Sequence, residues 1–267
     1  MLATIFTLIG CASKEQIIVP VSSEPNFGSF PGKHGAISSV PVHITASKNA
    51  EKSASVVIVH GCNGPNGASY RDWADFLADK GITAIQVDLF EERGLTNICA
   101  DGLEISLTTR SSVRDLESIA QWAKRQSWSN GKVGVIGFSL GAQSVLSAVS
   151  LGISDPVRMS NFSAAVAFYP DCRHYASRRL LVPLQVHIGK EDDWTPAEQC
   201  EVLATFWGQS TEPFSVSLYD DAHHGFDQFG LNSKFRCPRG QCTGRYNANA
   251  DLEARAKTVE FFQRYLD

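Results

Sequence analysis

The chain has 267 residues, which is enough for one large α/β domain or two small ones and for a substantial buried core. Hydrophobic residues make up 43% of the sequence and charged residues 19%, values that argue against an intrinsically disordered chain. Lys and Arg number 24 against 28 Asp and Glu, and the net charge of −4 predicts neither a nucleic-acid-binding protein nor one that binds an anionic membrane surface.

The first segment, residues 1–11 (MLATIFTLIGC), contains an apolar run of about ten residues, too short to span a bilayer. Its end, Leu8-Ile9-Gly10-Cys11, resembles a bacterial lipoprotein signal, in which cleavage before the cysteine leaves a lipidated N-terminus. No Lys or Arg precedes the apolar run, so a short buried strand or helix is the alternative. We expect export to the cell envelope or periplasm with a membrane tether at Cys11; the alternative location is the cytoplasm.

Residues 12–39 are rich in Ser, Gly and Pro and are expected to form a tether and an irregular entry into a single domain at 40–267. Short apolar segments in that domain predict strands at 55–60, 82–88, 133–137, 164–169, 184–188 and 214–219. Helical periodicity predicts helices at 69–80, 112–125, 141–151, 196–207 and 252–266. Strands that alternate with helices predict an α/β fold, a mostly parallel central sheet with helices on both faces.

A candidate nucleophile lies between the third predicted strand and the helix after it. Gly137-Phe138-Ser139-Leu140-Gly141 matches G-x-S-x-G, in which a sharp strand-to-helix turn demands small residues at both ends. The turn lifts the Ser139 hydroxyl above the sheet and leaves the Leu140 N–H free to bind an oxyanion. A glycine-lined helix start is the alternative interpretation of the five residues.

A serine nucleophile needs a base, and the base needs an orienting carboxylate, in the chain order Ser, Asp, His for this architecture. The loop after strand 184–188 carries Glu191, Asp192 and Asp193, and the loop after strand 214–219 carries His223 and His224. Because α/β enzymes assemble their sites at the carboxyl ends of strands, one residue from each loop is expected beside Ser139.

These motifs resemble the dienelactone hydrolase family of the α/β-hydrolase superfamily, from about residue 41 to the C-terminus. The resemblance rests on segments 60–64 (HGCNG), 137–141, 189–196 and 222–226 (AHHGF). It implies an α/β-hydrolase fold, in which the acid is Asp192 rather than Asp193 and the base is His224 rather than His223. It also implies an oxyanion hole formed by the backbone N–H groups of Cys62 and Leu140.

The sequence departs from the best-known members of that family. Ser139 stands where they have a cysteine, no acidic residue follows His60-Gly61-Cys62, and the arginines that bind the dienelactone carboxylate have no evident counterparts. We therefore expect a serine hydrolase that cleaves a small-molecule carboxylic ester or lactone through an acyl-enzyme, without a metal or an organic cofactor. A peptidase or thioesterase on the same triad, and a catalytically silent ligand-binding envelope lipoprotein, are the alternatives.

Plainer roles are expected for the neighbouring polar and aromatic residues. His60 and His187 are interpreted as hydrogen-bonded structural histidines, and His223 as a residue that packs beneath its loop or orients it. Asp193 and Glu191 are expected to be solvated or to cap the helix near residue 196. Trp194 is expected to pack, with the acyl pocket as its alternative place.

Six cysteines remain when Cys11 is set aside. They follow consecutive strands or close a short loop, which predicts three disulfides, Cys62–Cys99, Cys172–Cys200 and Cys237–Cys242. Buried free thiols are the alternative. A zinc site is not expected, because Cys237 and Cys242 have no second Cys or His pair at ligand spacing.

Overall fold

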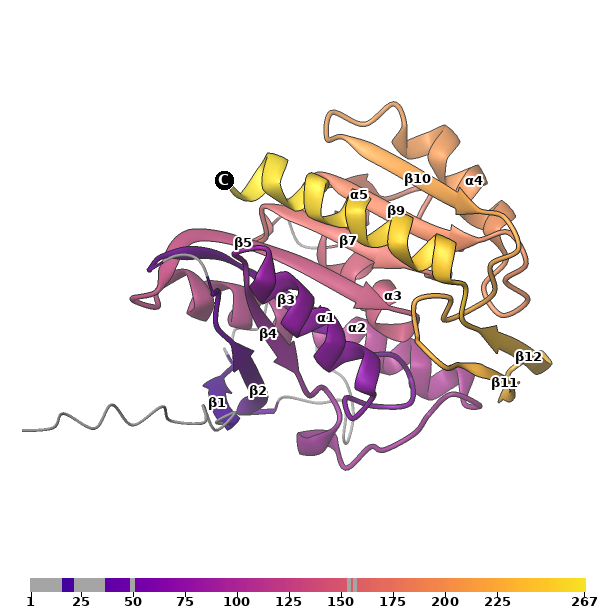
Figure 1. Cartoon of the computed structure of the whole chain (residues 1–267), viewed down its shortest axis with the longest axis horizontal. Helices are drawn as coiled ribbons and strands as arrows, with labels where there is room; N and C mark the ends of the chain where they lie inside the picture. The colour runs from indigo at the N-terminus through magenta and orange to yellow at the C-terminus, as the bar shows by residue number, and fades with distance from the viewer. Residues whose placement is uncertain (1–15, 22–36, 49–50, 153–154, 156–157) are drawn as a thin grey trace, which may run out of the picture.

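The computed structural model describes residues 16–21, 37–48, 51–152, 155 and 158–267; the signal-like segment 1–11, with Cys11, lies outside them. The described residues build one eight-stranded sheet (Figure 1). In spatial order its strands are β1 (Gln16–Pro20), β2 (Ser39–Thr45), β4 (Thr83–Val87), β3 (Ser53–Val59), β5 (Ser129–Phe138), β7 (Ala164–Phe168), β9 (Leu184–Gly189) and β10 (Phe214–Tyr219). Pairing is parallel from β4 to β10, and β2 is antiparallel to both of its neighbours.

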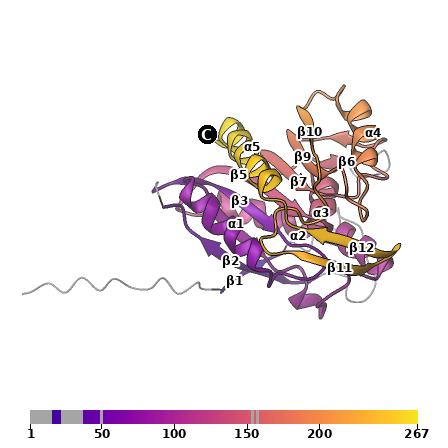
Figure 2. The same ribbon diagram turned by 45° about the vertical axis from the view of Figure 1, so that its right-hand side comes forward.

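Helices cover both faces of this sheet. They are α1 (Ala68–Asp79), α2 (Gly102–Lys124), α3 (Leu140–Ala148), α4 (Ala197–Trp207) and α5 (Ala248–Leu266), with a short 3-10 helix, η3 (Glu91–Arg93). Helices α1 and α5 lie on one face and α2 and α3 on the other (Figures 1 and 2), while α4 packs against β9 and β10. The predicted mostly parallel, helix-covered sheet is confirmed.

Two further strand pairs lie outside the main sheet. One is β6 (Ser150–Leu151) with β8 (Arg179–Leu180), and the other is the antiparallel hairpin of β11 (Asn232–Cys237) and β12 (Gly240–Arg245). No helix in the described part of the chain is long and apolar enough to cross a membrane.

The core explains why these segments become strands and helices. All seven residues of β3 are buried, as a strand covered on both faces requires, and β-branched side chains dominate it. Helix α1 buries one stripe that includes Trp73 and Leu77 against the sheet. Helix α2 begins at a side-chain cap, because the Asp101 carboxylate accepts hydrogen bonds from the amides of Leu103 and Glu104.

Two predicted boundaries were wrong. Residues 16–20, expected to lie in the irregular entry, form β1 at the edge of the sheet, where Val19 is fully buried against β2. Helix α2 begins at Gly102, not near residue 112. Its first turns bury Thr108 and Thr109, so they show no apolar stripe from which a helix could be predicted.

Candidate active site

Ser139 lies on the sharp turn between β5 and α3, with backbone angles φ 54° and ψ −114°. A Cβ atom at Gly137 would stand 2.3 Å from the carbonyl oxygen of Gly141, and one at Gly141 would stand 2.2 Å from the carbonyl oxygen of Val59. Any larger side chain would therefore force the backbone apart at these two positions. The steric reason predicted for both glycines is confirmed, and Ser139 has the strained backbone that a sharp strand-to-helix turn requires.

The structure brings the three side chains predicted as nucleophile, base and acid into one chain of hydrogen bonds. His224 Nε2 lies 2.9 Å from Ser139 Oγ, and His224 Nδ1 lies 2.8 Å from Asp192 Oδ2. His224 is 5% exposed and Asp192 3%. Because a carboxylate can only accept, Nδ1 carries the ring proton, and Nε2 is left to accept the proton of the serine hydroxyl.

Asp192 is fixed by its own loop as well as by the histidine. Its Oδ1 accepts hydrogen bonds from the amides of Trp194 (2.9 Å) and Thr195 (2.8 Å), and the Thr195 hydroxyl lies 3.0 Å from Oδ2. These bonds turn the chain between β9 and α4, so the carboxylate can rotate very little. With the His224 ring N–H, four donors surround this one buried carboxylate, so both of its oxygens are hydrogen-bonded and its direction towards the imidazole is fixed.

Two aromatic rings lie against the imidazole of His224. The Tyr169 ring centroid is 4.6 Å away and that of Trp194 is 4.8 Å away. Tyr169 donates its hydroxyl proton to Asp227 Oδ1 at 2.6 Å, and the indole N–H of Trp73 donates to Asp227 Oδ2 at 2.8 Å. Burial raises the pKa of the Asp227 carboxyl and also that of the Tyr169 phenol, which keeps the phenol protonated as a donor.

The predicted oxyanion side is the turn after β3. Leu140 is the first residue of α3, so its N–H has no partner within the helix and lies at the positive end of the helix dipole. Among the backbone hydrogen bonds that the described chain makes outside its helices and strands, the Cys62 amide donates none. The turn and the elbow are in close contact, because a Cβ at Gly141 would also stand 2.6 Å from the His60 carbonyl oxygen.

His60 and Tyr70 hold this turn from beneath. His60 Nδ1 lies 2.8 Å from the Gly61 carbonyl oxygen, and His60 Nε2 accepts a hydrogen bond from the Leu89 amide at 3.1 Å, which fixes the tautomer with the proton on Nδ1. Burial lowers the pKa of His60, consistent with this neutral form. The Tyr70 hydroxyl accepts from the Gly61 amide at 2.8 Å. His60 is thus a structural residue, as predicted.

Each of the three predicted cysteine pairs is disulfide-bonded in the structure, with S–S distances of 2.02, 1.99 and 2.04 Å in chain order. The Cys62–Cys99 bond ties the oxyanion turn to the loop before α2, and the Ile98 amide donates to the Cys62 carbonyl in the same place. Three disulfides in one chain hint at a location outside the reducing cytoplasm.

The other polar residues that the sequence analysis named lie around this site or in the core. His187 is a core residue, hydrogen-bonded to the Tyr219 hydroxyl at 2.8 Å, as predicted. Asp193 is exposed, as expected of a solvated residue, and does not cap α4; its unexpected feature is a partner, because both of its carboxylate oxygens accept hydrogen bonds from Thr243. Glu191 is exposed and His223 half-buried. Within the described residues, no group of three or more His, Cys, Asp or Glu is placed to hold a metal ion.

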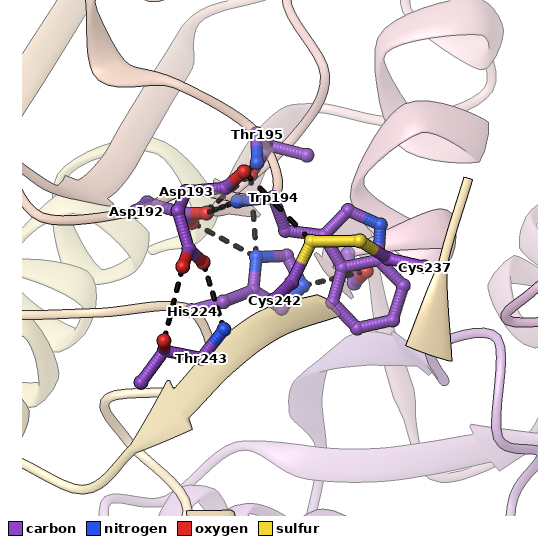
Figure 3. Close-up of a disulfide and its surroundings, with 9 residues drawn as sticks. Asp192, Asp193, Trp194, Thr195, His224, Cys237, Cys242 and Thr243 are labelled. Carbon is purple, nitrogen blue, oxygen red and sulfur yellow. Dashed lines mark hydrogen bonds and ion pairs between the residues drawn. A yellow bond between two sulfur atoms is a disulfide. The ribbon is translucent and has the colours of Figure 1, made fainter. Parts of the chain in front are cut away.

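The sequence interpretation missed the hairpin that borders the site. Strand β12 runs beside the His224 loop, with a bridge between Gly244 and His224, and Phe235 of β11 lies 6.1 Å from Trp194 between ring centroids. The Cys237–Cys242 pair, separated by Pro-Arg-Gly-Gln, was the signal that could have revealed a tight hairpin. Figure 3 shows this disulfide beside Trp194 and the imidazole of His224.

Comparison with known proteins shows the family and the fold of the chain. The model of the dienelactone hydrolase family matches residues 40–266. A carboxymethylenebutenolidase of Pseudomonas putida is 25% identical over 192 residues, which are 64% of this chain and 74% of the relative. The dienelactone hydrolase structure from Anabaena variabilis has a TM-score of 0.63 at 16% identity and covers 96% of this chain and 99% of its own. The propionate-bound esterase Est2 of Thermogutta terrifontis has a TM-score of 0.61 at 14% identity, with 85% and 91% covered. These likenesses show the α/β-hydrolase fold.

Proposed function

The chain belongs to the dienelactone hydrolase family and is a carboxylic ester hydrolase, and we propose that Ser139, His224 and Asp192 are its catalytic triad. The proposal rests above all on one observation, the unbroken hydrogen-bonded chain from Ser139 Oγ through both imidazole nitrogens of His224 to Asp192 Oδ2. The strained elbow and the burial of the acid support the same assignment.

Acylation follows from the direction of these hydrogen bonds. Ser139 Oγ attacks the ester carbonyl carbon while its proton passes to His224 Nε2, and Asp192 stabilises the imidazolium that forms. The carbonyl oxygen becomes an oxyanion, which the N–H groups of Cys62 and Leu140 bind. When the C–O bond to the leaving group breaks, the imidazolium returns the proton to the departing alcohol, and the acyl group remains on Ser139.

Deacylation repeats the sequence with water as the nucleophile. His224 Nε2 takes a proton from a water molecule as its oxygen attacks the acyl carbon, and the oxyanion again lies at the Cys62 and Leu140 amides. Collapse of this intermediate breaks the bond to Ser139 Oγ, which recovers its proton from His224. The acid leaves and the hydroxyl is restored. No step needs a metal or a redox cofactor, and we propose a small-molecule carboxylic ester or lactone as substrate.

Labelling with a fluorophosphonate, followed by intact-mass analysis, tests the triad. We expect one adduct on the wild type, mapped to the peptide that contains Ser139, none on Ser139→Ala, and labelling at least about 100-fold slower on His224→Ala. His223→Ala is the matched control and should label like the wild type, since His223 has no place in the hydrogen-bonded chain. A folded wild-type protein that forms no adduct would overturn the proposal.

Substrate class is tested with matched acyl compounds on the same enzyme. Each of them presents one acyl group as an alkyl ester, a lactone, a thioester or an aminoacyl amide. We expect the highest kcat/KM for the esters or lactones, and loss of all turnover in Ser139→Ala. A preference for the amide or the thioester would replace the ester by a peptidase or thioesterase function on the same residues.

We also propose that the chain works outside the cytoplasm, held to a membrane by a lipid on Cys11. The three disulfides support export, and Leu8-Ile9-Gly10-Cys11 supports the lipid attachment. We expect the expressed full chain in the membrane fraction and Cys11→Ser in the soluble fraction. Equal distribution of the two would overturn the tether and leave the enzymatic proposal untouched.

A further inference from the structure

The edge of β12 that faces away from β11 contacts both loops, the one that carries Asp192 and the one that carries His224. Along a strand, every second N–H points to the same edge, and Thr243 and Arg245 are two such residues. The Thr243 amide donates to Asp193 Oδ1 at 2.8 Å, and the Arg245 amide donates to the His224 carbonyl oxygen at 3.2 Å. One strand therefore binds the segments of Asp192 and His224, although these two residues are 32 positions apart in the sequence.

The contact with the acid loop is bidentate. Besides the amide bond to Oδ1, the Thr243 hydroxyl donates to Asp193 Oδ2 at 3.0 Å, so both carboxylate oxygens are engaged by one residue (Figure 3). Two bonds to a planar carboxylate fix its direction as well as its distance. Asp193 is directed away from the imidazole that its neighbour Asp192 binds. The bond to Thr243 therefore also keeps a second carboxylate from competing for His224.

The hairpin that supplies Thr243 is itself held closed. The Cys237–Cys242 disulfide joins its two strands at the turn, and Cys242 Sγ lies 3.8 Å from the Asp193 carbonyl oxygen. Gly244, the residue after Thr243, leaves room for the Phe235 ring of the other strand, because a Cβ there would stand 2.3 Å from that ring. Asp193 is thus bound to a closed two-stranded element and not to a solitary loop.

We propose that Asp193 is a positioning residue of this esterase: by binding Thr243 it fastens β12 to the acid loop, and so sets the place of Asp192 relative to His224. The inference rests on the proposed triad. Asp193 does not touch the reacting atoms and acts through Asp192. Removing its carboxylate removes both hydrogen bonds that join the acid loop to Thr243, and displacement of a catalytic group by about 1 Å can cost about 10²-fold in rate.

The first experiment compares kcat and KM of Asp193→Ala with those of Glu191→Ala. Glu191 is an exposed carboxylate on the same loop, which makes its variant the matched control for loss of one negative charge. We expect Asp193→Ala to lower kcat between about 10-fold and 100-fold with KM within about twofold, because the substrate pocket is kept while the acid is misplaced. Glu191→Ala should equal the wild type. Equal kcat values for the two variants would overturn the inference.

Variants of Thr243 keep the inference testable if Asp193→Ala fails to fold. Thr243→Val keeps the shape and the amide bond and removes only the hydroxyl, so we expect kcat to fall by a smaller factor, about 3-fold to 10-fold. Thr243→Ser keeps both donors and should restore wild-type kcat. Wild-type activity in Thr243→Val would contradict the proposal as directly as wild-type activity in Asp193→Ala.

A double-variant experiment separates positioning from simple stabilisation. In an Asp192→Ala background, loss of the Asp193 carboxylate should change the fluorophosphonate labelling rate of Ser139 by less than about twofold, because there is no acid left to place. A full loss in that background would mean that Asp193 does not act through Asp192. If the wild type itself does not label, the proposed triad fails; if it labels and Asp193→Ala labels equally fast, only the inference fails.

Discussion

Ser139 is placed by five consecutive residues, whereas Asp192 and His224 lie on two loops that meet only in the folded protein. At the elbow, Gly137 and Gly141 allow the backbone to approach within distances that no other residue permits. The acid and base loops follow the paired strands β9 and β10 and are in close contact, because a Cβ at Gly189 would stand 2.1 Å from the Ala222 carbonyl oxygen. Strand β12, which is distant in the sequence, adds bonds to both loops: Thr243 binds Asp193, and the Arg245 amide donates to the His224 carbonyl oxygen.

This difference separates a site that is fixed locally from one that is fixed at long range. A site fixed locally tolerates few substitutions at its own residues and is insensitive to substitutions at distant ones. A site fixed at long range depends in addition on the separate element that joins its two loops. The following variants and conditions are ordered from the largest expected effect to the smallest.

Asp192→Asn should have the largest effect on activity. The amide keeps the size of the side chain but cannot stabilise an imidazolium, and it favours the wrong tautomer of His224, so we expect kcat to fall by about 10⁴-fold. Steady-state kinetics with a soluble ester measure this, and Glu191→Gln serves as the control on the same loop. A loss below about tenfold would mean that the carboxylate does not orient the base.

Gly137→Ala should break the elbow while leaving the acid and base loops intact. Its Cβ would stand 2.3 Å from the Gly141 carbonyl oxygen, so the backbone must move. We expect a loss of about 3 kcal/mol in the free energy of unfolding, with kcat reduced by at least about 10²-fold. Denaturant unfolding and ester kinetics measure the two effects. Gly102→Ala is the control, because the nearest atom to a Cβ there is 3.9 Å away.

Removing one disulfide at a time should separate an effect on stability from an effect on activity. In the chain-entropy model, loss of Cys172–Cys200, with a sequence separation of 28, costs between about 3 and 4 kcal/mol. Loss of Cys237–Cys242, with a separation of 5, costs about 2 kcal/mol. Only the second bond closes the hairpin that holds Asp193.

For Cys237→Ser with Cys242→Ser we therefore expect the smaller loss of stability and a loss of about fivefold in kcat. Cys172→Ser with Cys200→Ser should lose more stability and keep its kcat. Thermal unfolding and kinetics on both double variants measure this. The reverse order of kcat values would show that the hairpin does not set the geometry of the acid loop.

The smallest effect on kcat is expected from a group in the sheet beneath the acid loop, which acts on the pH dependence of stability. Burial, with a smaller contribution from Lys257, lowers the pKa of His187 from 6.5 to about 3. Between these values the unfolded chain binds a proton that the folded protein does not. The stabilising contribution is therefore complete above about pH 6.5 and is lost as the pH falls towards 3, by at most about 1.4 kcal/mol per pH unit.

His187→Gln should flatten the profile of unfolding free energy between pH 4 and 6.5, and His43→Gln, which changes an exposed histidine of β2, should leave it as in the wild type. Denaturant unfolding at several pH values measures the slopes. Identical slopes for wild type and His187→Gln would show that the buried histidine is not the group that titrates.

The same contrast explains how much of the molecule the sequence predicts. The elbow could be predicted because its requirement lies in five adjacent residues between a strand and a helix. The parallel sheet could be predicted from apolar strands, and the disulfide partners from cysteines that follow neighbouring strands. Asp192 and Asp193 look alike in the sequence, and the choice between them came from the family resemblance, not from their chemistry.

What the sequence did not predict depends on contacts between distant segments. The first turns of α2 bury polar residues such as Thr108, so their pattern is not that of an amphipathic helix. Strand β1 is five residues long and exists by pairing with β2. The role of Asp193 requires Thr243, a partner 50 residues away, and the role of Tyr169 requires Asp227. None of these pairings follows from local periodicity.

The most direct test of the central claim is to trap the acyl-enzyme. The wild type is mixed with a 4-nitrophenyl ester of a hindered acid, chosen because hindrance slows deacylation, and is quenched with acid before peptide mass analysis. The triad predicts a burst of about one nitrophenolate per enzyme and an acyl group on Ser139, both absent from Ser139→Ala. Turnover of the ester with the acyl group on another residue, or with no acyl group on the protein, would contradict the account.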